Sequence, residues 1–271
     1  MTAFERLREL LRELAPLLVA FSGGVDSTLV LKAALEAVGS DNVLAVTAHG
    51  PVHSAWELEV ARGTALRLGA RHLILATNEL ALPGFAANAP DRCRICRESL
   101  FGKLLEMARL EGMRSVVDGT NSDDFEDFRP GLVAARDLGV RSPLAELGLR
   151  KQDVRMLARE LGLPGWERPS SPCLASRFPY GEPITLTGLK MVEEGERYLR
   201  ELGFREVRVR HHGSLARVEL GRSEVVRAAE ESMRRDIVRH LRALGYLYVA
   251  LDLEGYRSGS LNEALARDQG F

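Results

Sequence analysis

The first half of the chain alternates short apolar runs with longer segments of helical spacing, and this alternation limits the fold more than any other feature. The apolar runs are Leu17 to Phe21, Val43 to Thr47, His72 to Ala76 and Ser115 to Val117. The helical segments between them are Thr28 to Ala37, Trp56 to Leu68 and Leu100 to Leu110. Two parallel strands need a helix's worth of chain to connect them. The pattern therefore predicts an α/β fold with a doubly wound, mostly parallel sheet.

Two more helices are predicted at 131–139 and 150–161, and then the pattern changes. Turn-forming residues dominate 164–183, and a loop this long in a compact chain is usually functional or disordered. Its arginines, tyrosine and cysteine argue against disorder. Beyond it we expect a helix, a hairpin, one long helix and a strand, at 186–202, 206–220, 224–244 and 246–251. The predicted domains are residues 1–165 and a smaller α+β domain at 184–271, joined by an inter-domain active-site loop at 166–183.

Charge and hydropathy exclude several classes of partner. The chain has 37 basic and 38 acidic side chains, a formal charge of -1, so it has no global positive field for nucleic acid. The segment after Ile184 carries 15 basic and 14 acidic residues, which disfavours an RNA-binding domain. The longest apolar run is about eight residues, well short of the roughly eighteen that span a bilayer. With an amphipathic start in place of a signal peptide, we expect a cytoplasmic protein.

The segment Ser22-Gly23-Gly24-Val25-Asp26-Ser27 lies directly between the first apolar run and a helix. Glycines there let backbone N–H groups approach an anion, the hydroxyls add donors, and the helix amino terminus contributes a positive dipole. The segment lacks the Lys-Ser/Thr ending of a Walker A loop and the G-x-G-x-x-G of a dinucleotide fold. It predicts a polyphosphate site, with a glycine-rich turn capped by Asp26 or Ser27 as the alternative.

Four polar residues follow the last apolar run, at the carboxyl edge of the sheet where doubly wound folds bind ligands. They are Asp118, Asn121, Asp123 and Asp124. We expect some of them to orient Mg²⁺ or a ribose, with a solvated acidic turn as the alternative.

The three cysteines are Cys93, Cys96 and Cys173, and the first two form a C-x-x-C pair. In a reducing compartment such a pair more often binds metal or does redox chemistry than forms a disulfide framework. A redox pair with Cys173 as a small buried residue stays open, and so does zinc. A closed zinc site needs four ligands, and a fourth is not evident.

Arg208 and Arg210 alternate on a predicted strand, so both side chains lie on one face of it. Together they could grip a phosphate through bidentate hydrogen bonds. The alternative is a solvated, charged face, because the chain uses 33 arginines against four lysines.

The loop at 22–27 resembles the PP-loop of ATP pyrophosphatases, and with three further stretches it resembles the LarE family of sulfur transferases over nearly the whole chain. These stretches are Gly119-Thr120-Asn121-Ser122-Asp123-Asp124 with Phe128-Arg129-Pro130-Gly131, Ser171-Pro172-Cys173-Leu174-Ala175-Ser176-Arg177-Phe178-Pro179-Tyr180-Gly181, and Gly255-Tyr256-Arg257-Ser258-Gly259-Ser260-Leu261-Asn262-Glu263.

The resemblance implies an enzyme that uses ATP and Mg²⁺ to adenylate a carboxylate of a pyridinium dicarboxylate mononucleotide, releasing pyrophosphate. It then converts the adenylate into a thiocarboxylate for the nickel-pincer cofactor of lactate racemase. On this basis ATP is expected at Ser22, Gly23, Gly24, Asp26, Ser27, Asn121 and Asp124. The substrate phosphate is expected at Arg208 and Arg210, and Asp26 and Cys173 are expected to be catalytic. The family also implies a homo-oligomer.

The resemblance leaves two routes for the sulfur. In one form of the family a single cysteine, here Cys173, gives up its own sulfur and becomes dehydroalanine. Another form has two additional cysteines, which Cys93 and Cys96 match. We predict that the three cysteines converge and hold three irons of a [4Fe-4S] cluster, whose fourth iron binds a sulfide from an external donor. The sacrificial route and a tRNA-thiolating enzyme remain the alternatives.

Overall fold

The computed structural model describes residues 1–125, 130–168 and 172–257, which form two compact units. The first unit comprises Met1–Leu82 and Asp91–Ser170, and the second comprises Pro83–Pro90 and Ser171–Phe271. The chain therefore leaves the first unit after Ser170, inside the loop expected at 166–183. It also makes an earlier excursion at 83–90, which no sequence pattern indicated.

The first unit contains a four-stranded parallel sheet of order β3-β2-β1-β4. Its strands are β1 (Leu17–Ala20), β2 (Val43–His49), β3 (Arg71–Ala76) and β4 (Ser115–Val117). These are the four apolar runs of the sequence, so the predicted strands are confirmed. The order places β1 in the middle of the sheet, with β2 and β4 on its two sides.

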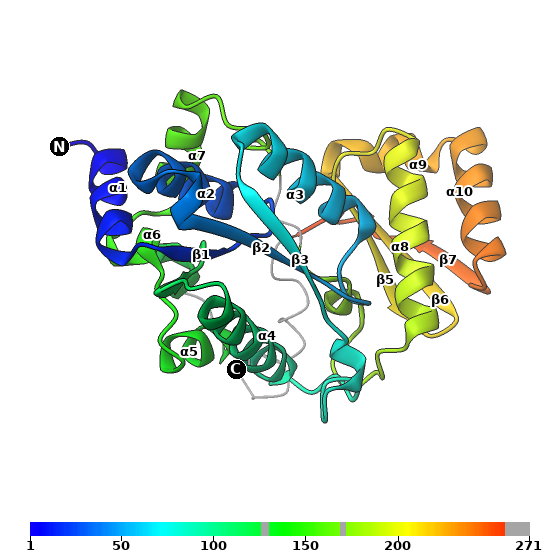
Figure 1. Cartoon of the computed structure of the whole chain (residues 1–271). Helices are drawn as coiled ribbons and strands as arrows, with labels where there is room; N and C mark the ends of the chain where they lie inside the picture. The colour runs from blue at the N-terminus through cyan, green and yellow to red at the C-terminus, as the bar shows by residue number, and fades with distance from the viewer. Residues whose placement is uncertain (126–129, 169–171, 258–271) are drawn as a thin grey trace, which may run out of the picture. The chain divides into compact units, whose positions relative to one another are not determined.

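Helices cover both faces of this sheet (Figure 1). Leu17 and Val19 of β1 point into a core with α1 (Ala3–Leu14), α2 (Val25–Val38), α3 (Ala55–Leu68) and α7 (Lys151–Glu160). Leu18 points into the opposite core, with α4 (Arg92–Leu110) and α5 (Pro130–Asp137). The short α6 (Pro143–Glu146) lies between α5 and α7 in the chain. Since successive strand residues face opposite cores, the doubly wound prediction is confirmed.

Helix α4 begins eight residues earlier than its apolar spacing indicated. Its first two turns, Arg-Cys-Arg-Ile-Cys-Arg-Glu, carry mostly polar side chains, so hydrophobic periodicity cannot reveal them. The consequence is that Cys93 and Cys96 lie on a helix and not in a loop.

The second unit is built on a three-stranded sheet of order β5-β6-β7. Strands β5 (Val207–His212) and β6 (Leu215–Leu220) form the predicted antiparallel hairpin, and β7 (Tyr248–Leu251) runs parallel to β6. One face of the sheet packs on α8 (Leu186–Glu201) and on the helices that follow β6. The smaller α+β unit expected after the loop is therefore present.

The prediction of a single long helix at 224–244 is wrong. Two helices replace it, α9 (Val225–Ala229) and α10 (Glu231–Ala243), separated by Glu230 in an extended conformation. Ala228 and Ile237 both lie in the core of the second unit. Nine residues at about 100° each would place them on opposite sides of one straight helix, so the helix has to break for both to be buried.

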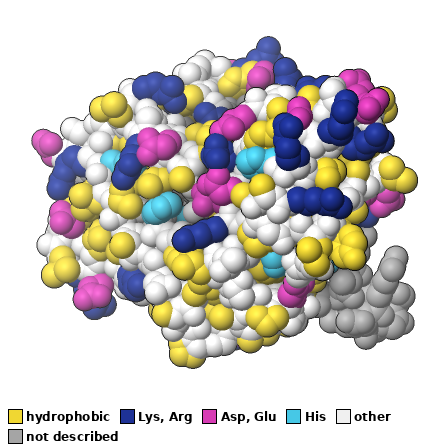
Figure 2. Space-filling model, turned by 90° about the vertical axis from the view of Figure 1, so that its right-hand side faces the viewer, with side chains coloured by type: hydrophobic (Ala, Val, Ile, Leu, Met, Phe, Trp, Pro, Cys, Tyr) yellow, Lys and Arg dark blue, Asp and Glu magenta, His cyan; other side chains and the backbone are white. Residues whose placement is uncertain are grey.

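Figure 2 shows basic side chains interspersed with acidic ones on the face that it presents. On α10, Arg235 contacts Glu231 and Arg239 contacts Asp236. No helix within the described residues has the length and apolar character needed to cross a membrane.

Candidate functional site

The glycine-rich segment forms the turn between β1 and α2, at the carboxyl end of the central strand. Gly24 is the N-cap of α2 and supplies no side-chain cap, while Ser27 donates its hydroxyl to the Gly24 carbonyl at 3.1 Å. The Ser22 and Ser27 hydroxyl oxygens lie 3.1 Å apart. The turn is therefore not capped by Asp26 or Ser27, and hydroxyls and first-turn N–H groups gather at the start of a helix, as an anion site requires.

The two glycines of this turn have different roles. Gly23 has φ +73°, and a Cβ there would lie 2.8 Å from the Ala61 Cα in α3. Gly24 has an ordinary backbone conformation, and a Cβ there would meet only the Ser22 Oγ, at 3.3 Å. Gly23 is thus required by close packing, whereas the space beside Gly24 is open enough for a ligand.

Asp26 is held by two side chains from later in the sequence. The Asn121 Nδ2 donates to its Oδ1 at 3.2 Å, and the Lys151 ammonium donates to its Oδ2. Asn121 follows β4 and Lys151 is the first residue of α7. The structure therefore brings Asp26 and Asn121 together, as a shared site requires, and adds a cation beside them.

The polar residues after β4 divide into two groups. Asp118 is buried and accepts hydrogen bonds from Thr120 and Ser142, so it organises the loop. Asp124 accepts the Asn121 backbone N–H at 3.0 Å, and Asp123 accepts the Lys151 N–H at 2.9 Å. These two carboxylates are half-buried. Asp124 therefore holds the backbone at Asn121 in position, and Asp123 holds the backbone at Lys151.

Lys151 was not identified from the sequence. It is one of only four lysines among 37 basic side chains, and it is the second residue of the helix predicted at 150–161. That rarity, combined with a position at a helix start, is the signal that could have identified it. Its pairing with Asp26 could not be foreseen, because the two residues are 125 positions apart.

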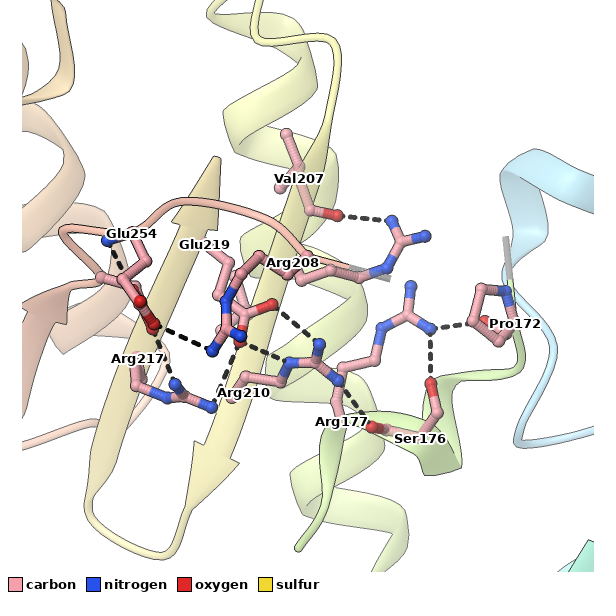
Figure 3. Close-up of polar contacts among 12 residues, drawn as sticks. Pro172, Ser176, Arg177, Val207, Arg208, Arg210, Arg217, Glu219 and Glu254 are labelled. Carbon is pink, nitrogen blue, oxygen red and sulfur yellow. Dashed lines mark hydrogen bonds and ion pairs between the residues drawn. The ribbon is translucent and has the colours of Figure 1, made fainter. Parts of the chain in front are cut away.

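In the second unit, Arg208 and Arg210 lie on the same face of β5, as predicted. The two residues are only 5% and 7% exposed, so the alternative of a solvated charged face is wrong. Arg210 forms a bidentate pair with Glu219, at 2.9 and 2.7 Å, and donates to the Ser176 carbonyl at 2.9 Å (Figure 3).

Arg208 donates to the Val207 carbonyl, and its guanidinium lies over the Tyr256 ring, 4.9 Å from the centroid. Burial, together with the neighbouring positive charge of Arg177, lowers the pKa of Arg208. An anion bound there would relieve both effects, because it would replace lost hydration and compensate the clustered charge.

Cys173 begins a short helical turn, Leu174–Arg177, that belongs to the second unit. Asn88 holds the residues that follow it, since its amide donates to the carbonyls of Phe178, Pro179 and Glu182 at 3.4, 2.7 and 2.9 Å. Asn88 is fully buried and has a positive φ of 60°. This contact explains why residues 83–90 pack with the second unit.

The other two cysteines lie on the first turns of α4 in the first unit, where Cys93 is exposed and Cys96 is half-buried. Residues three apart on a helix share one face. The described residues include no group of three or more His, Cys, Asp or Glu side chains placed to hold a metal ion. Phe128, Arg129, Ser171 and Ser258 to Glu263, which carry part of the family resemblance, lie outside the described residues.

Comparison with known proteins identifies relatives over nearly the whole chain, although no family model matches it. An uncharacterized protein of Synechocystis sp. is 45% identical over 263 residues, 97% of this chain and 98% of that protein. Pyridinium-3,5-bisthiocarboxylic acid mononucleotide synthase of Lactiplantibacillus plantarum is 41% identical over 260 residues, 96% of this chain and 93% of the synthase.

A shorter match covers about half of the chain. Argininosuccinate synthase of Haloarcula marismortui is 32% identical over 156 residues, 54% of this chain and 37% of the synthase. The parallel sheet with its glycine-rich turn is consistent with this match, and the architecture is that of a PP-loop ATP pyrophosphatase. The full-length similarity goes further than the fold: the chain belongs to the LarE family.

Proposed function

We propose that the protein is an ATP-dependent sulfur transferase that acts on pyridinium-3,5-dicarboxylate mononucleotide. It adenylates a carboxylate of this substrate and converts the adenylate into a thiocarboxylate, releasing pyrophosphate and AMP. The observation that carries the proposal is the 41% identity, over 96% of the chain, to a synthase of the corresponding bisthiocarboxylic acid mononucleotide. The product would serve the nickel-pincer cofactor of lactate racemase, made by an enzyme that we expect to be a homo-oligomer.

In the first step a substrate carboxylate oxygen attacks the α-phosphorus of ATP, and the bond to the β-phosphate breaks. Negative charge then develops on the departing pyrophosphate. The N–H groups of Gly23 and Gly24, the hydroxyls of Ser22 and Ser27 and the amino terminus of α2 would stabilise that charge. Lys151 adds a cation beside the same turn.

The acidic residues at this edge have the donor chemistry that Mg²⁺ requires. Mg²⁺ usually binds nucleotide phosphates together with one or two carboxylates, so it needs no larger protein cage. Asp26, Asp123 and Asp124 supply carboxylates within the hydrogen-bonded set around Asn121 and Lys151. When bound, Mg²⁺ would neutralise charge on the phosphates.

The second unit would recognise the substrate through its phosphate. Arg208 combines a buried guanidinium with neighbouring positive charge, and Arg210 lies two residues further on the same face of β5. A guanidinium matches phosphate oxygens bidentately. Arg208 and Arg210 would thus hold the mononucleotide, and the loop in the first unit would hold ATP.

For the sulfur we propose a [4Fe-4S] cluster with Cys93, Cys96 and Cys173 as ligands. Cys93 and Cys96 fit this role, because they lie three residues apart on one face of the first turns of α4, and cysteine thiolates are the usual ligands of such clusters. The cluster would supply a labile sulfide to displace AMP from the acyl carbon.

The test is mass spectrometry of substrate and protein after incubation with ATP, Mg²⁺ and the pyridinium substrate, following anaerobic reconstitution with iron and sulfide. We expect several thiocarboxylates per chain and a broad visible absorption band, both lost in Cys93→Ala, Cys96→Ala or Cys173→Ala. A single turnover that leaves Cys173 as dehydroalanine and does not depend on Cys93 and Cys96 would overturn the cluster. If ATP binds but no AMP forms, the enzymatic proposal itself fails.

A further inference from the structure

The guanidinium of Arg177 is fully buried, with 1% of the side chain exposed, and is bound on all sides. Its Nη1 donates to the Pro172 carbonyl, to the Cys173 carbonyl at 3.0 Å and to the Ser176 hydroxyl at 3.0 Å. Its Nε and Nη2 donate to the two carboxylate oxygens of Glu196 at 2.7 and 2.9 Å. One rigid fork therefore links a carboxylate in α8 to the backbone on both sides of the Cys173 nitrogen.

Glu196 is itself fixed, so it provides a firm anchor for Arg177. It lies on α8 with 1% exposure, and it also accepts the Arg200 guanidinium at 2.8 Å and the Val209 N–H at 3.2 Å. Burial opposes ionisation of this carboxyl, but the charges of Arg177, Arg208 and Arg200 together hold its pKa below the ordinary value. Glu196 is therefore an anion with defined partners, and it orients the Arg177 fork.

A second ion pair holds the other end of the same turn. Arg210 donates to the Ser176 carbonyl while its other nitrogens bind Glu219. In Figure 3 the guanidinium of Arg177 points toward Pro172 and Ser176, and that of Arg210 lies between Ser176 and Glu219. The turn that begins at Cys173 is thus held by hydrogen bonds to two arginines, each of which is paired with a buried glutamate.

We propose that Arg177 is a positioning residue for Cys173. It would fix the two peptide groups around this cysteine and so aim the thiol for sulfur transfer. The consequence for turnover rests on the proposed function, whereas the effect on the thiol itself does not. Without Arg177 the carbonyls of Pro172 and Cys173 would lose this common donor, and the backbone around Cys173 could take several orientations.

Lysine is a discriminating substitution at this position. Its ammonium can compensate the Glu196 charge, but it cannot present the planar fork that reaches Glu196 and the carbonyls together. If Arg177 only compensates the buried charge of Glu196, Arg177→Lys should keep the wild-type ratio of thiocarboxylate to AMP and the wild-type reactivity of Cys173. If Arg177 positions Cys173, the variant folds but loses the alignment of the thiol.

The first measurement is the ratio of thiocarboxylate to AMP formed by Arg177→Lys. We expect the rate of AMP formation to stay within about threefold of the wild type, since lysine keeps the positive charge beside Arg208 and the adenylation loop is in the first unit. We expect the ratio to fall at least tenfold. The matched control is Arg197→Lys on α8, the helix that carries Glu196. Arg197 is an exposed arginine that pairs with Glu194 and Glu201. This control should leave the ratio unchanged.

The second measurement needs no substrate, so it separates this inference from the proposed function. Protein purified in air and reduced is treated with iodoacetamide, and alkylation of each cysteine is followed by peptide mass spectrometry. We expect the rate at Cys173 to change at least threefold in Arg177→Lys, with Cys93 and Cys96 as unchanged internal references.

A folded Arg177→Lys protein with wild-type ratio and wild-type Cys173 alkylation would overturn the inference. If that variant does not fold, Arg210→Lys serves in the alkylation assay, because it releases the Ser176 carbonyl from the other end of the turn. An unchanged Cys173 rate there would equally count against positioning by these pairs. If the wild type forms no AMP, only the proposed function fails and the alkylation result still stands.

Discussion

Lys151 and Asp26 form an ion pair across 125 positions of sequence, joining the first residue of α7 to the first turn of α2. Asn121 binds the other oxygen of the same carboxylate. The start of α2, the loop after β4 and the start of α7 therefore meet at the Asp26 carboxylate. The pair lies beside the glycine-rich turn, where the proposed adenylation places the most negative charge.

Replacing Lys151 by methionine should reduce AMP formation about 100-fold, since it removes a cation from beside developing negative charge. The unfolding free energy should fall by less than about 1 kcal/mol, because the pair is partly exposed to solvent. Steady-state AMP release and urea unfolding measure the two effects. Lys32→Met is the matched control, because Lys32 pairs with Glu36 on the same helix α2 at 2.9 Å. Equal AMP release by both variants would refute the role of Lys151.

The two glycines of the turn should respond differently to substitution. Gly24→Val should abolish AMP formation, because the valine side chain would occupy the space proposed for the phosphate. The unfolding free energy should stay within about 1 kcal/mol of the wild type, because a Cβ at this position contacts only the Ser22 Oγ. Gly23→Ala should destabilise the fold by about 2 kcal/mol, since it combines a left-handed backbone with a contact of 2.8 Å to Ala61. Calorimetric unfolding and AMP release are measured together. Full adenylation by folded Gly24→Val would remove the loop from the active site.

Arg208→Met should weaken binding of the pyridinium mononucleotide by about 2–5 kcal/mol, the range for loss of one partner of a buried charge pair. ATP affinity should be nearly unchanged, as titration calorimetry with each ligand can show. Arg210 is less suitable for charge reversal, because a new carboxylate there would face the buried Glu219. Exposed Arg222→Met is the control. Equal loss for both ligands would indicate a structural role for Arg208.

Four histidines should make the fold sensitive to mild acid. Burial lowers the pKa of His53, His72, His211 and His212, so the unfolded chain binds more protons than the native state below about pH 6.5. Their contribution is therefore complete above that pH and declines as the pH falls toward the lowered native values. Urea unfolding at pH 7.5, 6.5 and 5.5 should show this decline, and a constant free energy would contradict it.

His211 shows the structural cause. Its Nδ1 lies 3.0 Å from the hydroxyl oxygen of buried Tyr246. In the tautomer whose Nδ1 accepts the phenolic proton, protonation of the imidazole removes that acceptor and leaves the phenolic proton without its partner.

The strands and most helices could be predicted because each is encoded by neighbouring residues. Buried parallel strands read as continuous apolar runs, and the glycines of the turn follow the first of them. The start of α4 and the break at Glu230 could not be predicted. The first turns of α4 carry mostly polar side chains, so they show no apolar spacing. The helix breaks at Glu230 because Ala228 and Ile237 both pack into the core of the second unit.

The sequence by itself determined the α/β class, the glycine-rich turn, the shared face of Arg208 and Arg210 and the likeness to LarE proteins, since all of these depend on local order and spacing. Tertiary structure alone decided that Lys151 meets Asp26, that residues 83–90 pack with the second unit through Asn88, and that Arg177 binds Glu196 and the backbone around Cys173. The physical reason is that a buried charge or amide requires a partner but does not specify which one. Only the packing of distant segments brings a particular carboxylate or carbonyl within reach.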